Sequence, residues 1–204
     1  MLQGKTAIVT GGTRGIGLAI VKCFLTNGAR VALFGSRPET VDKALAQIKE
    51  ERPDAPVMGL SPDLTDYTSV KAAVEKVAAA FNGVDILVNN AGGYPSEIYD
   101  KVKQQAIKIW EWSETQWDQI IKTNLKIPFL CTNKIIPAMI KRRSGHIINI
   151  SSRMGRIASQ MGAYACAKSA VVTLTKTTAI QAQEYGVRCN AIAPGMLTRS
   201  VQHS

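Results

Sequence analysis

Three tyrosine–lysine pairs stand four residues apart in the chain, at Tyr67 and Lys71, Tyr99 and Lys103, and Tyr164 and Lys168. Residues four apart share one face of a helix, so the phenol and the ammonium of a pair can both face one substrate and transfer a proton. At least two of the matches must be coincidental. Only Tyr164 follows a predicted strand ending in two serines, IINISS at 147–152, from which a short loop can return it beside them.

The glycine-rich turn TGGTRGIG at 10–17 is a second candidate site. It follows an apolar predicted strand and opens a predicted helix, which is the context in which such a loop binds a dinucleotide. Gly11 would permit a tight turn, Gly15 the approach of a pyrophosphate, and Gly17 close packing of the helix on the sheet. The helix N-terminus offers free N–H groups and partial positive charge to phosphates. A helix entry that is glycine-rich by coincidence is the weaker alternative.

The end of the second predicted strand bears on which dinucleotide is bound. An NAD site usually carries an acidic residue there for the ribose 2′-hydroxyl, whereas this chain reads VALFGSR, with Ser36 and Arg37 and no carboxylate. Arg14 in the glycine loop is a second cation within reach. Guanidinium groups bind phosphate oxygens in a fork, so the pair favours the 2′-phosphate of NADP(H) over NAD(H), although either arginine alone could be a plain surface residue.

The motifs occur in a characteristic order: TGGTRGIG at 10–17, DL at 63–64, NNAG at 89–92, Asn124 in TNL, Ser152, Tyr164-Ala-Cys-Ala-Lys168 and Pro194-Gly195. This set resembles the short-chain dehydrogenase/reductase family over almost the whole chain. The resemblance implies an NADP-dependent oxidoreductase that transfers hydride between nicotinamide and a carbonyl or secondary alcohol. It also implies a Rossmann fold, with a doubly wound parallel sheet in strand order 3-2-1-4-5-6 and helices on both faces.

The resemblance assigns four catalytic residues. Tyr164 would be the general acid and base, and Ser152 would hydrogen-bond the substrate oxygen; Ser151 is the alternative, because the loop from Ser152 to Tyr164 is one residue short. Asn124 would hold a water that links Lys168 to solvent. A free tyrosine has a pKa near 10, so working near pH 7 requires roughly 4 kcal/mol of phenolate stabilisation. An ammonium about 4 Å away supplies this at an effective dielectric constant of about 20, so Lys168 is expected to lower the pKa of Tyr164.

The resemblance also assigns the cofactor contacts. They lie in the glycine loop and after later strands, at Gly11, Thr13, Arg14, Gly15, Ile16, Gly17, Ser36, Arg37, Asp63, Leu64, Asn90, Ala91, Gly92, Tyr164, Lys168, Pro194 and Gly195. Without the resemblance, Asp63 is better interpreted as the cap of the following helix, and Asn124 as a residue that caps or kinks its own helix.

Short apolar runs alternate with helical patterns along the chain. The predicted strands are 7–9, 30–34, 57–60, 85–88, 146–150 and 187–192, and the predicted helices are 16–27, 39–51, 67–81, 114–141 and 162–184. Strands that are apolar on both faces and separated by helices indicate a parallel sheet covered on both sides. No linker or repeat interrupts residues 1–204, so a single Rossmann-type domain is expected.

Composition narrows the partners. The net charge is +10, but the cations are spread along the chain with no run longer than 141–143, so a nucleic-acid partner is not expected. No apolar run approaches the ~20 residues of a membrane span. Scattered cysteines and two histidines predict no metal site and a cytoplasmic or other reducing compartment. The expected partners are a small carbonyl or alcohol substrate and copies of the chain in a homo-oligomer, a dimer or tetramer.

Two departures from the family pattern carry expectations of their own. The 93–113 stretch is longer than usual, with Ile98, Val102 and Ile109 at helical spacing; it is either a surface helix covering its own apolar face, or a lid or subunit contact. The chain also lacks the family's usual C-terminal segment. If it ends at Ser204, ordinary NADPH affinity with weak turnover is expected, unless 93–113 serves as the lid. A non-catalytic NADP-binding scaffold and an enoyl-thioester reductase are the alternative functions.

Overall fold

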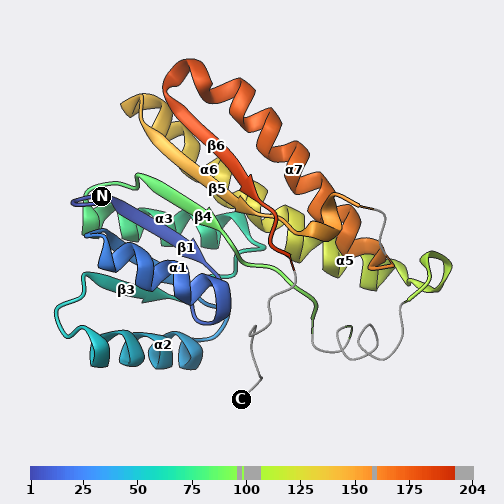
Figure 1. Ribbon diagram of the computed structural model, residues 1–204, viewed down its shortest axis with the longest axis horizontal. Coiled ribbons are helices and arrows are strands. Elements are labelled where there is room, and N and C mark those ends of the chain that lie inside the picture. Colours follow the sequence, from blue (N-terminus) through green and yellow to red (C-terminus); the bar gives the residue numbers. More distant parts are fainter. Residues whose placement is uncertain (96–97, 99–106, 158–159, 196–204) are drawn as a thin grey trace.

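The computed structural model describes residues 1–95, 98, 107–157 and 160–195, which form a six-stranded sheet with helices on both faces (Figure 1). The strands are β1 (Thr6–Thr10), β2 (Arg30–Phe34), β3 (Val57–Leu60), β4 (Ile86–Asn89), β5 (Gly145–Ile150) and β6 (Val187–Ile192). All the strand pairs are parallel, and the order is β3-β2-β1-β4-β5-β6. The predicted fold class and strand order are confirmed.

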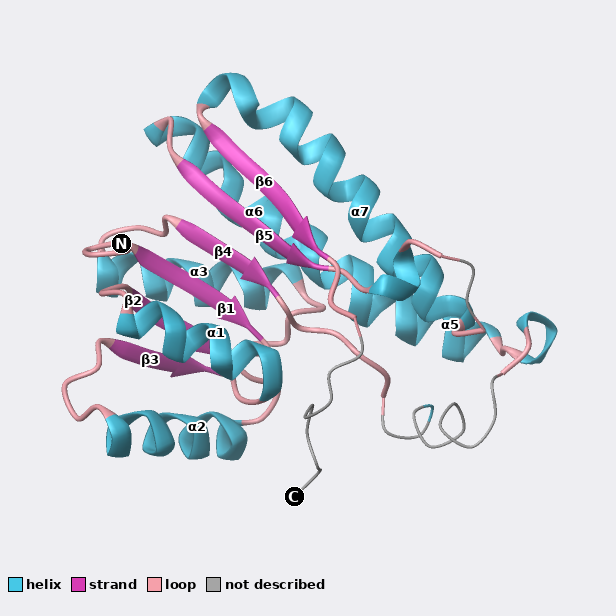
Figure 2. Cartoon of the chain, in the orientation of Figure 1, coloured by secondary structure: helices cyan, strands magenta, loops and turns pink. Residues whose placement is uncertain are grey.

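The helices lie on the two faces of this sheet (Figure 2). They are α1 (Gly15–Thr26), α2 (Pro38–Glu51), α3 (Tyr67–Phe81), α5 (Glu114–Ile121), α6 (Ile127–Arg142) and α7 (Gly162–Ala182). Helices α1 and α2 pack with one set of strand side chains, and α3, α6 and α7 pack with the alternate set. Successive strand residues point to opposite faces, which is why continuous apolar runs such as Ala7-Ile8-Val9 supply both cores.

The predicted helical stretch at 114–141 is confirmed, although it is not a uniform α-helix. Residues Lys122–Lys126 form a π-helical turn between α5 and α6, in which the N–H of Ile127 bonds the carbonyl of Lys122. The Asn124 side chain donates to the carbonyl of Ile120 (3.0 Å). Pro128 follows Asn124 by four residues and has no N–H to donate to its carbonyl. The sequence TNLKIP at 123–128 therefore contains a signal for the π-helical turn, the proline four residues after Asn124.

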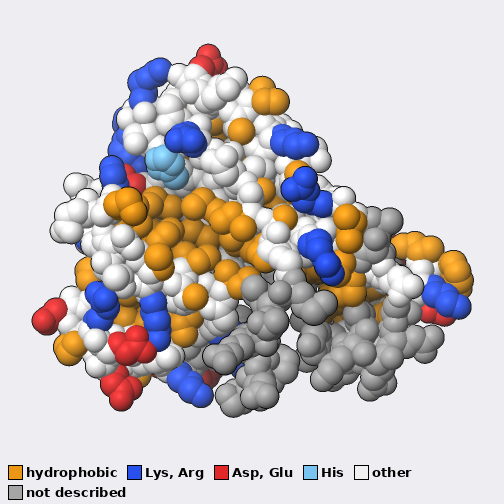
Figure 3. Space-filling view, in the orientation of Figure 1, with side chains coloured by type: hydrophobic (Ala, Val, Ile, Leu, Met, Phe, Trp, Pro, Cys, Tyr) orange, Lys and Arg blue, Asp and Glu red, His pale blue; other side chains and the backbone are white. Residues whose placement is uncertain are grey.

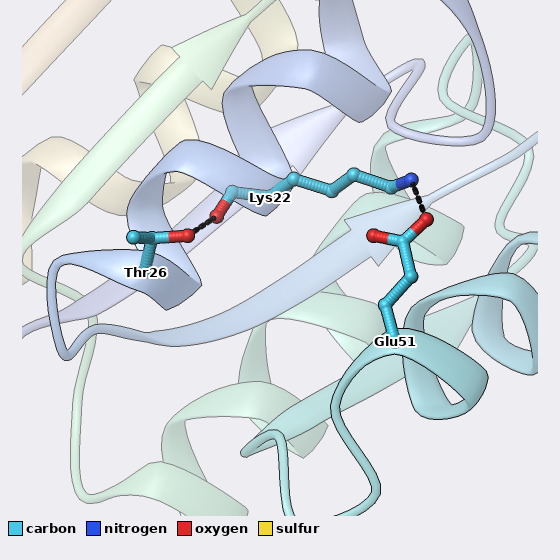
Figure 4. A network of polar contacts seen from close by, with 3 residues as sticks. All are labelled: Lys22, Thr26 and Glu51. Carbon is cyan, nitrogen blue, oxygen red and sulfur yellow. Dashed lines mark hydrogen bonds and ion pairs between the residues drawn. The ribbon is translucent and has the colours of Figure 1, made fainter.

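Exposed polar contacts lie within α1 and between α1 and α2. Lys22 in the C-terminal half of α1 forms an ion pair with Glu51 at the end of α2, 2.5 Å apart (Figure 4). The hydroxyl of Thr26 donates to the carbonyl of Lys22. Both charged side chains are substantially exposed, so the pair contributes about 0–1 kcal/mol to stability.

One face of the sheet is only partly covered by the described residues. Apolar side chains gather over β4 and β5 between α1 and α7 (Figure 3). Ile148 is only partly buried there, and Ile192 on β6 is 52% exposed. Within the part of the chain that the structure describes, no helix is long and apolar enough to cross a membrane.

Candidate active site

The predicted site residues gather at the carboxyl edge of the sheet. Strands β1 and β4 are neighbours, and the chain leaves them toward opposite sides, with β2 and β3 beyond β1 and with β5 and β6 beyond β4. Loops after adjacent strands diverge at such a switch point, which is where open α/β sheets bind ligands. The loops after all six strands carry residues predicted from the sequence.

Close backbone packing explains the glycines of the first loop. Gly11 has a φ of +63°, which favours glycine. A Cβ on Gly17 would lie 2.0 Å from the carbonyl oxygen of Gly11 and 2.6 Å from Nδ2 of Asn90. Gly17 therefore lets α1 pack closely on the residues that directly follow β1 and β4. Gly12, not predicted as a site residue, lies in a similarly close space, because a Cβ there would lie 2.8 Å from Cβ of Leu33 in β2.

Hydrogen bonds join the glycine loop to the NNAG segment. The hydroxyl of Thr10 accepts from the N–H groups of Asn90 and Ala91, both at 3.0 Å. The amide of Asn90 donates to the carbonyls of Thr10 and Gly11. Asn90 and Ala91 thus hold the loop in place, and Thr10 is a buried contributor that sequence reasoning missed although it lies within the quoted motif.

The start of α1 fits a pyrophosphate. Arg14 is the N-cap residue in an extended conformation, its side chain makes no capping bond, and the first turn holds no acidic residue. Gly15 begins the helix with a φ of +54°, and Ile16 follows, partly buried. The first helical N–H groups therefore have neither a side-chain cap nor a carboxylate competing for them, which leaves them available to an anion.

The end of β2 presents polar and basic side chains. Gly35 is buried against Thr13, since a Cβ there would lie 2.6 Å from Cγ2 of Thr13. Ser36, Arg37 and Arg14 are exposed. No carboxylate among the described residues forms an ion pair with either arginine. Both guanidinium groups are therefore available to a bound phosphate.

The loop after β3 separates the roles predicted for its two residues. Asp63 accepts hydrogen bonds from the hydroxyl and the N–H of Thr65, and these bonds hold the pKa of Asp63 below its usual value. Asp66, not Asp63, caps α3 by accepting from the N–H of Ser69, so the capping alternative for Asp63 is wrong. The Leu64 side chain is buried in the core, which leaves only its backbone to contact a ligand.

Lys168 lies in the interior beside Tyr164. Its ammonium donates to the carbonyl of Ile150 at the end of β5 (2.9 Å) and lies 5.7 Å from the centre of the Tyr164 ring. Burial lowers the pKa of Lys168 to about 8. Burial also raises the pKa of Tyr164, and a hydrogen bond with the Ser152 side chain opposes that rise. The expected lowering of the Tyr164 pKa by Lys168 is thus not found in this structure, where burial dominates.

The two adjacent serines have different surroundings. Ser151 is buried, and its hydroxyl donates to the carbonyl of Lys168 within α7 (2.8 Å). Ser152 is partly buried, accepts from the N–H of Met154, and shares a hydrogen bond with the Tyr164 side chain. The geometry therefore brings Ser152 to the tyrosine and ties Ser151 to the helix backbone.

Asn124 joins the π-helical turn to the loop after β4. Its amide donates to the carbonyl of Gly93 and its oxygen accepts from the N–H of Gly93, both at 2.8 Å. Gly92 packs closely on the site, because a Cβ there would lie 2.8 Å from the Asn124 oxygen and 3.2 Å from Nζ of Lys168. Both polar ends of the Asn124 side chain are thus bound to protein, which leaves its backbone carbonyl for the predicted water.

The loop after β6 returns to the serines. The N–H of Ser151 donates to the carbonyl of Ile192 (2.7 Å), and the N–H of Arg153 donates to that of Pro194 (3.0 Å). Pro194 and the following Gly195 therefore lie beside the turn that carries Ser152.

The 93–113 stretch contacts the start of α7 rather than standing apart. Ile98 is 2% exposed and belongs to a cluster with Ile120, Ala163 and Ala167, against which Tyr94, Ile107, Trp112 and Tyr164 pack. Ile109, predicted on the same apolar face as Ile98, is 60% exposed. Val102 lies outside the described residues. Of the two other tyrosine–lysine matches, Tyr99–Lys103 also lies outside them, and Tyr67 is 43% exposed at the start of α3. The contacts of Ile98 and Tyr94 with α5 and α7 do not fit the first alternative, a surface helix that covers only its own apolar face.

Comparison with known proteins agrees with this arrangement. The sequence model of the family described as short chain dehydrogenase matches residues 5–204. The chain belongs to this family. It is therefore an oxidoreductase of the short-chain dehydrogenase type, a family that uses NAD or NADP.

Individual relatives extend the comparison. The chain is 41% identical to a 3alpha-hydroxysteroid dehydrogenase of Mediterraneibacter gnavus over 96% of this chain and 75% of that protein. It is 34% identical to a 3-oxoacyl-(acyl-carrier-protein) reductase of Staphylococcus aureus over 97% and 76%. The crystal structure of levodione reductase superposes with a TM-score of 0.87 at 29% identity, over 96% of this chain and 72% of that one.

Proposed function

We propose that this short-chain dehydrogenase is an NADP(H)-dependent oxidoreductase that interconverts a carbonyl and a secondary alcohol, with Tyr164 as the acid and base. The observation that carries the proposal is that the Ser152 side chain acts on the Tyr164 hydroxyl, with the ammonium of Lys168, one helical turn farther along, 5.7 Å from the centre of the Tyr164 ring. A phenol and a second hydroxyl at one point can both reach a single substrate oxygen.

The side chains then divide the proton chemistry. When bound, the nicotinamide supplies or accepts the hydride. In the reductive direction the Tyr164 hydroxyl gives its proton to the substrate oxygen, and the Ser152 hydroxyl donates a hydrogen bond to the same oxygen. Lys168 holds the nicotinamide ribose. Asn124 fixes the loop after β4 through Gly93 and offers its backbone carbonyl to the water that reaches Lys168.

The preference for NADP(H) rests on the residues after β1 and β2. Arg14 and Arg37 are exposed, and the turn after β2 has Ser36 where an NAD site would carry a carboxylate. The remaining cofactor contacts lie on the loops described above, from Gly11 and Thr13 through Asp63 and Asn90 to Gly195.

Two alternatives remain distinguishable. A reductase of enoyl thioesters would use the same fold, but the Ser152–Tyr164 pair favours a substrate that presents a carbonyl or hydroxyl oxygen. The names of the two relatives describe a hydroxysteroid and a 3-oxoacyl substrate, which are of this kind. A non-catalytic NADP-binding scaffold would not need Ser152 beside Tyr164, because no cofactor contact is assigned to that serine.

The test is a panel of ketosteroids, 3-oxoacyl thioesters, simple ketones and enoyl thioesters, each assayed with NADPH and with NADH. We expect turnover of at least one carbonyl class, with NADPH preferred. Turnover of enoyl thioesters alone would replace the proposal with the second function. Cofactor binding with no turnover of any class would favour the scaffold.

The compartment and the assembly are also proposals. All four cysteines are free thiols, which fits a reducing compartment such as the cytoplasm. The homo-oligomer and the absence of a nucleic-acid partner stay predictions, and size-exclusion chromatography with light scattering measures the first.

A further inference from the structure

Tyr94 lies directly on the proposed acid–base residue, although no motif drew attention to it. Its ring stacks on that of Tyr164, with centroids 5.0 Å apart and planes inclined by 27°. Both rings are partly buried. Aromatic pairs at this separation attract one another beyond the area that they bury, so each ring restricts the other.

Two anchors hold the Tyr94 ring in place. Its hydroxyl donates to the carbonyl of Met161 (3.2 Å), which also accepts from the N–H of Tyr164 (3.1 Å). On the other side, the preceding residue Gly93 is bound by both ends of the Asn124 side chain. Tyr94 therefore spans from the loop after β4 to the first turn of α7, the turn that carries Tyr164.

Trp112 closes the same turn from the far end of the 93–113 stretch. Its indole N–H donates to the carbonyl of Ile107 (3.2 Å). A Cβ on Gly162, the first residue of α7, would lie 2.6 Å from that indole nitrogen. Tyr94 and Trp112 thus both pack at the start of α7, where Tyr164 is positioned.

We propose that Tyr94 is a positioning residue for Tyr164: its ring covers one face of the Tyr164 ring, fixes the direction of the phenol hydroxyl, and forms a wall of the substrate site. This inference rests on the proposed role of Tyr164 as acid and base. It gives the loop after β4 a function, because Gly93 and Asn124 hold that loop where Tyr94 reaches Tyr164.

The wall also keeps water from Tyr164. Burial raises the pKa of Tyr164. Burial also raises the pKa of Tyr94, and the nearby Tyr164 raises it further. Among the described residues, Lys168 is the charged side chain placed against the Tyr164 ring. Removing the Tyr94 ring exposes Tyr164 to solvent, so the pKa of Tyr164 should fall.

The test compares Tyr94→Phe with Tyr94→Leu in the full chain, and Tyr94→Met replaces the latter if it does not fold. Trp110→Ala is the matched control, because Trp110 comes from the same stretch and is 76% exposed. The readouts are kcat and KM for the substrate found by the panel, the pH profile of alcohol oxidation, NADPH affinity by fluorescence titration, and the melting temperature.

Tyr94→Phe keeps the ring, so we expect its kcat to stay close to that of the wild type. Tyr94→Leu should lower kcat by roughly three- to tenfold and move the rising, acidic limb of the pH profile of alcohol oxidation to lower pH, with NADPH affinity unchanged. An unchanged pH profile in Tyr94→Leu, or a loss in Tyr94→Phe as large as in Tyr94→Leu, would overturn the inference. Loss of NADPH affinity would do the same.

The two proposals fail separately. If Tyr164→Phe still turns over, the proposed function fails. If Tyr164→Phe is inactive while Tyr94→Leu matches Trp110→Ala, the positioning role alone fails.

Discussion

The proposed cofactor half of the candidate site and its proposed catalytic half are built in different ways. Around β1 and β2 the site depends on missing side chains, free helical N–H groups and exposed arginines, as at Gly17, Arg14 and Arg37. Around β5 and α7 it depends on buried polar side chains held by backbone atoms, as at Ser151 and Lys168. The first half leaves N–H groups and cations available to an anion. The second half holds hydrogen-bond donors and acceptors in fixed positions.

This difference predicts how each half responds to substitution. Exposed cations can be removed without leaving a buried group unpaired, so their loss should appear in ligand affinity alone. Removing a buried donor leaves its partner unsatisfied, so the loss should appear in catalysis and in stability together.

The largest contrast within the catalytic half should lie between the two serines. Ser152→Ala removes the hydroxyl beside Tyr164 and should lower kcat by about 10²–10³, as the loss of an oxyanion donor does. Ser151→Ala breaks the bond to the carbonyl of Lys168 and should mainly cost about 1 kcal/mol of stability.

Steady-state kinetics and denaturant unfolding of both serine variants measure this contrast. Ser169→Ala is the matched control, since its exposed hydroxyl also donates to a backbone carbonyl, that of Gly155. A larger fall in kcat for Ser151→Ala than for Ser152→Ala would reverse the assignment.

The buried ammonium gives the catalytic half a pH signature. Burial holds the pKa of Lys168 at about 8 in the folded chain against 10.5 as the ordinary value, so between these pH values the unfolded chain binds more protons. The wild type should therefore gain up to about 3 kcal/mol of stability relative to Lys168→Met as the pH rises through that window, and lose it as the pH falls through 8. Urea unfolding of the cofactor-free proteins at pH 7 to 10 checks this, and a constant difference would contradict it.

The cofactor half is tested by its two arginines. Removing one charge-assisted hydrogen bond to the phosphate should cost about 1.5–3 kcal/mol, or roughly ten- to a hundredfold in affinity. The double variant Arg14→Ala and Arg37→Asp should therefore weaken NADPH binding far more than NADH binding and leave stability unchanged. Fluorescence titration with both dinucleotides measures this difference. Equal losses of affinity for NADPH and NADH would show that the two arginines do not bind the 2′-phosphate.

The same division explains what the sequence could predict. The strands, the glycine loop and the turn after β2 follow from short contiguous segments, because a strand followed by glycines and a helix defines its own geometry. The predicted bounds of four elements (30–34, 57–60, 67–81 and 187–192) equal the observed ones, and those of most others differ by no more than two residues at either end.

The catalytic half depends on partners far apart in the chain. The sequence favours Ser152 over Ser151 only through the resemblance to the family, and it does not show that Ser151 instead bonds the backbone of α7. Nothing near Tyr94 indicates that it stacks on a residue seventy positions later. The sequence contains the charge of Lys168 but not the burial of Tyr164, which raises the pKa of that phenol in the folded chain.

Tyr164→Phe tests the central claim most directly, with cofactor titration and turnover measured on the same preparation. The phenyl ring can still stack on Tyr94, so the fold and the glycine loop should be undisturbed. We expect NADPH affinity within about twofold of the wild type and a kcat lower by at least about 10²-fold, since the general acid is removed. Turnover equal to that of the wild type would contradict the account, because Tyr164 would then transfer no proton.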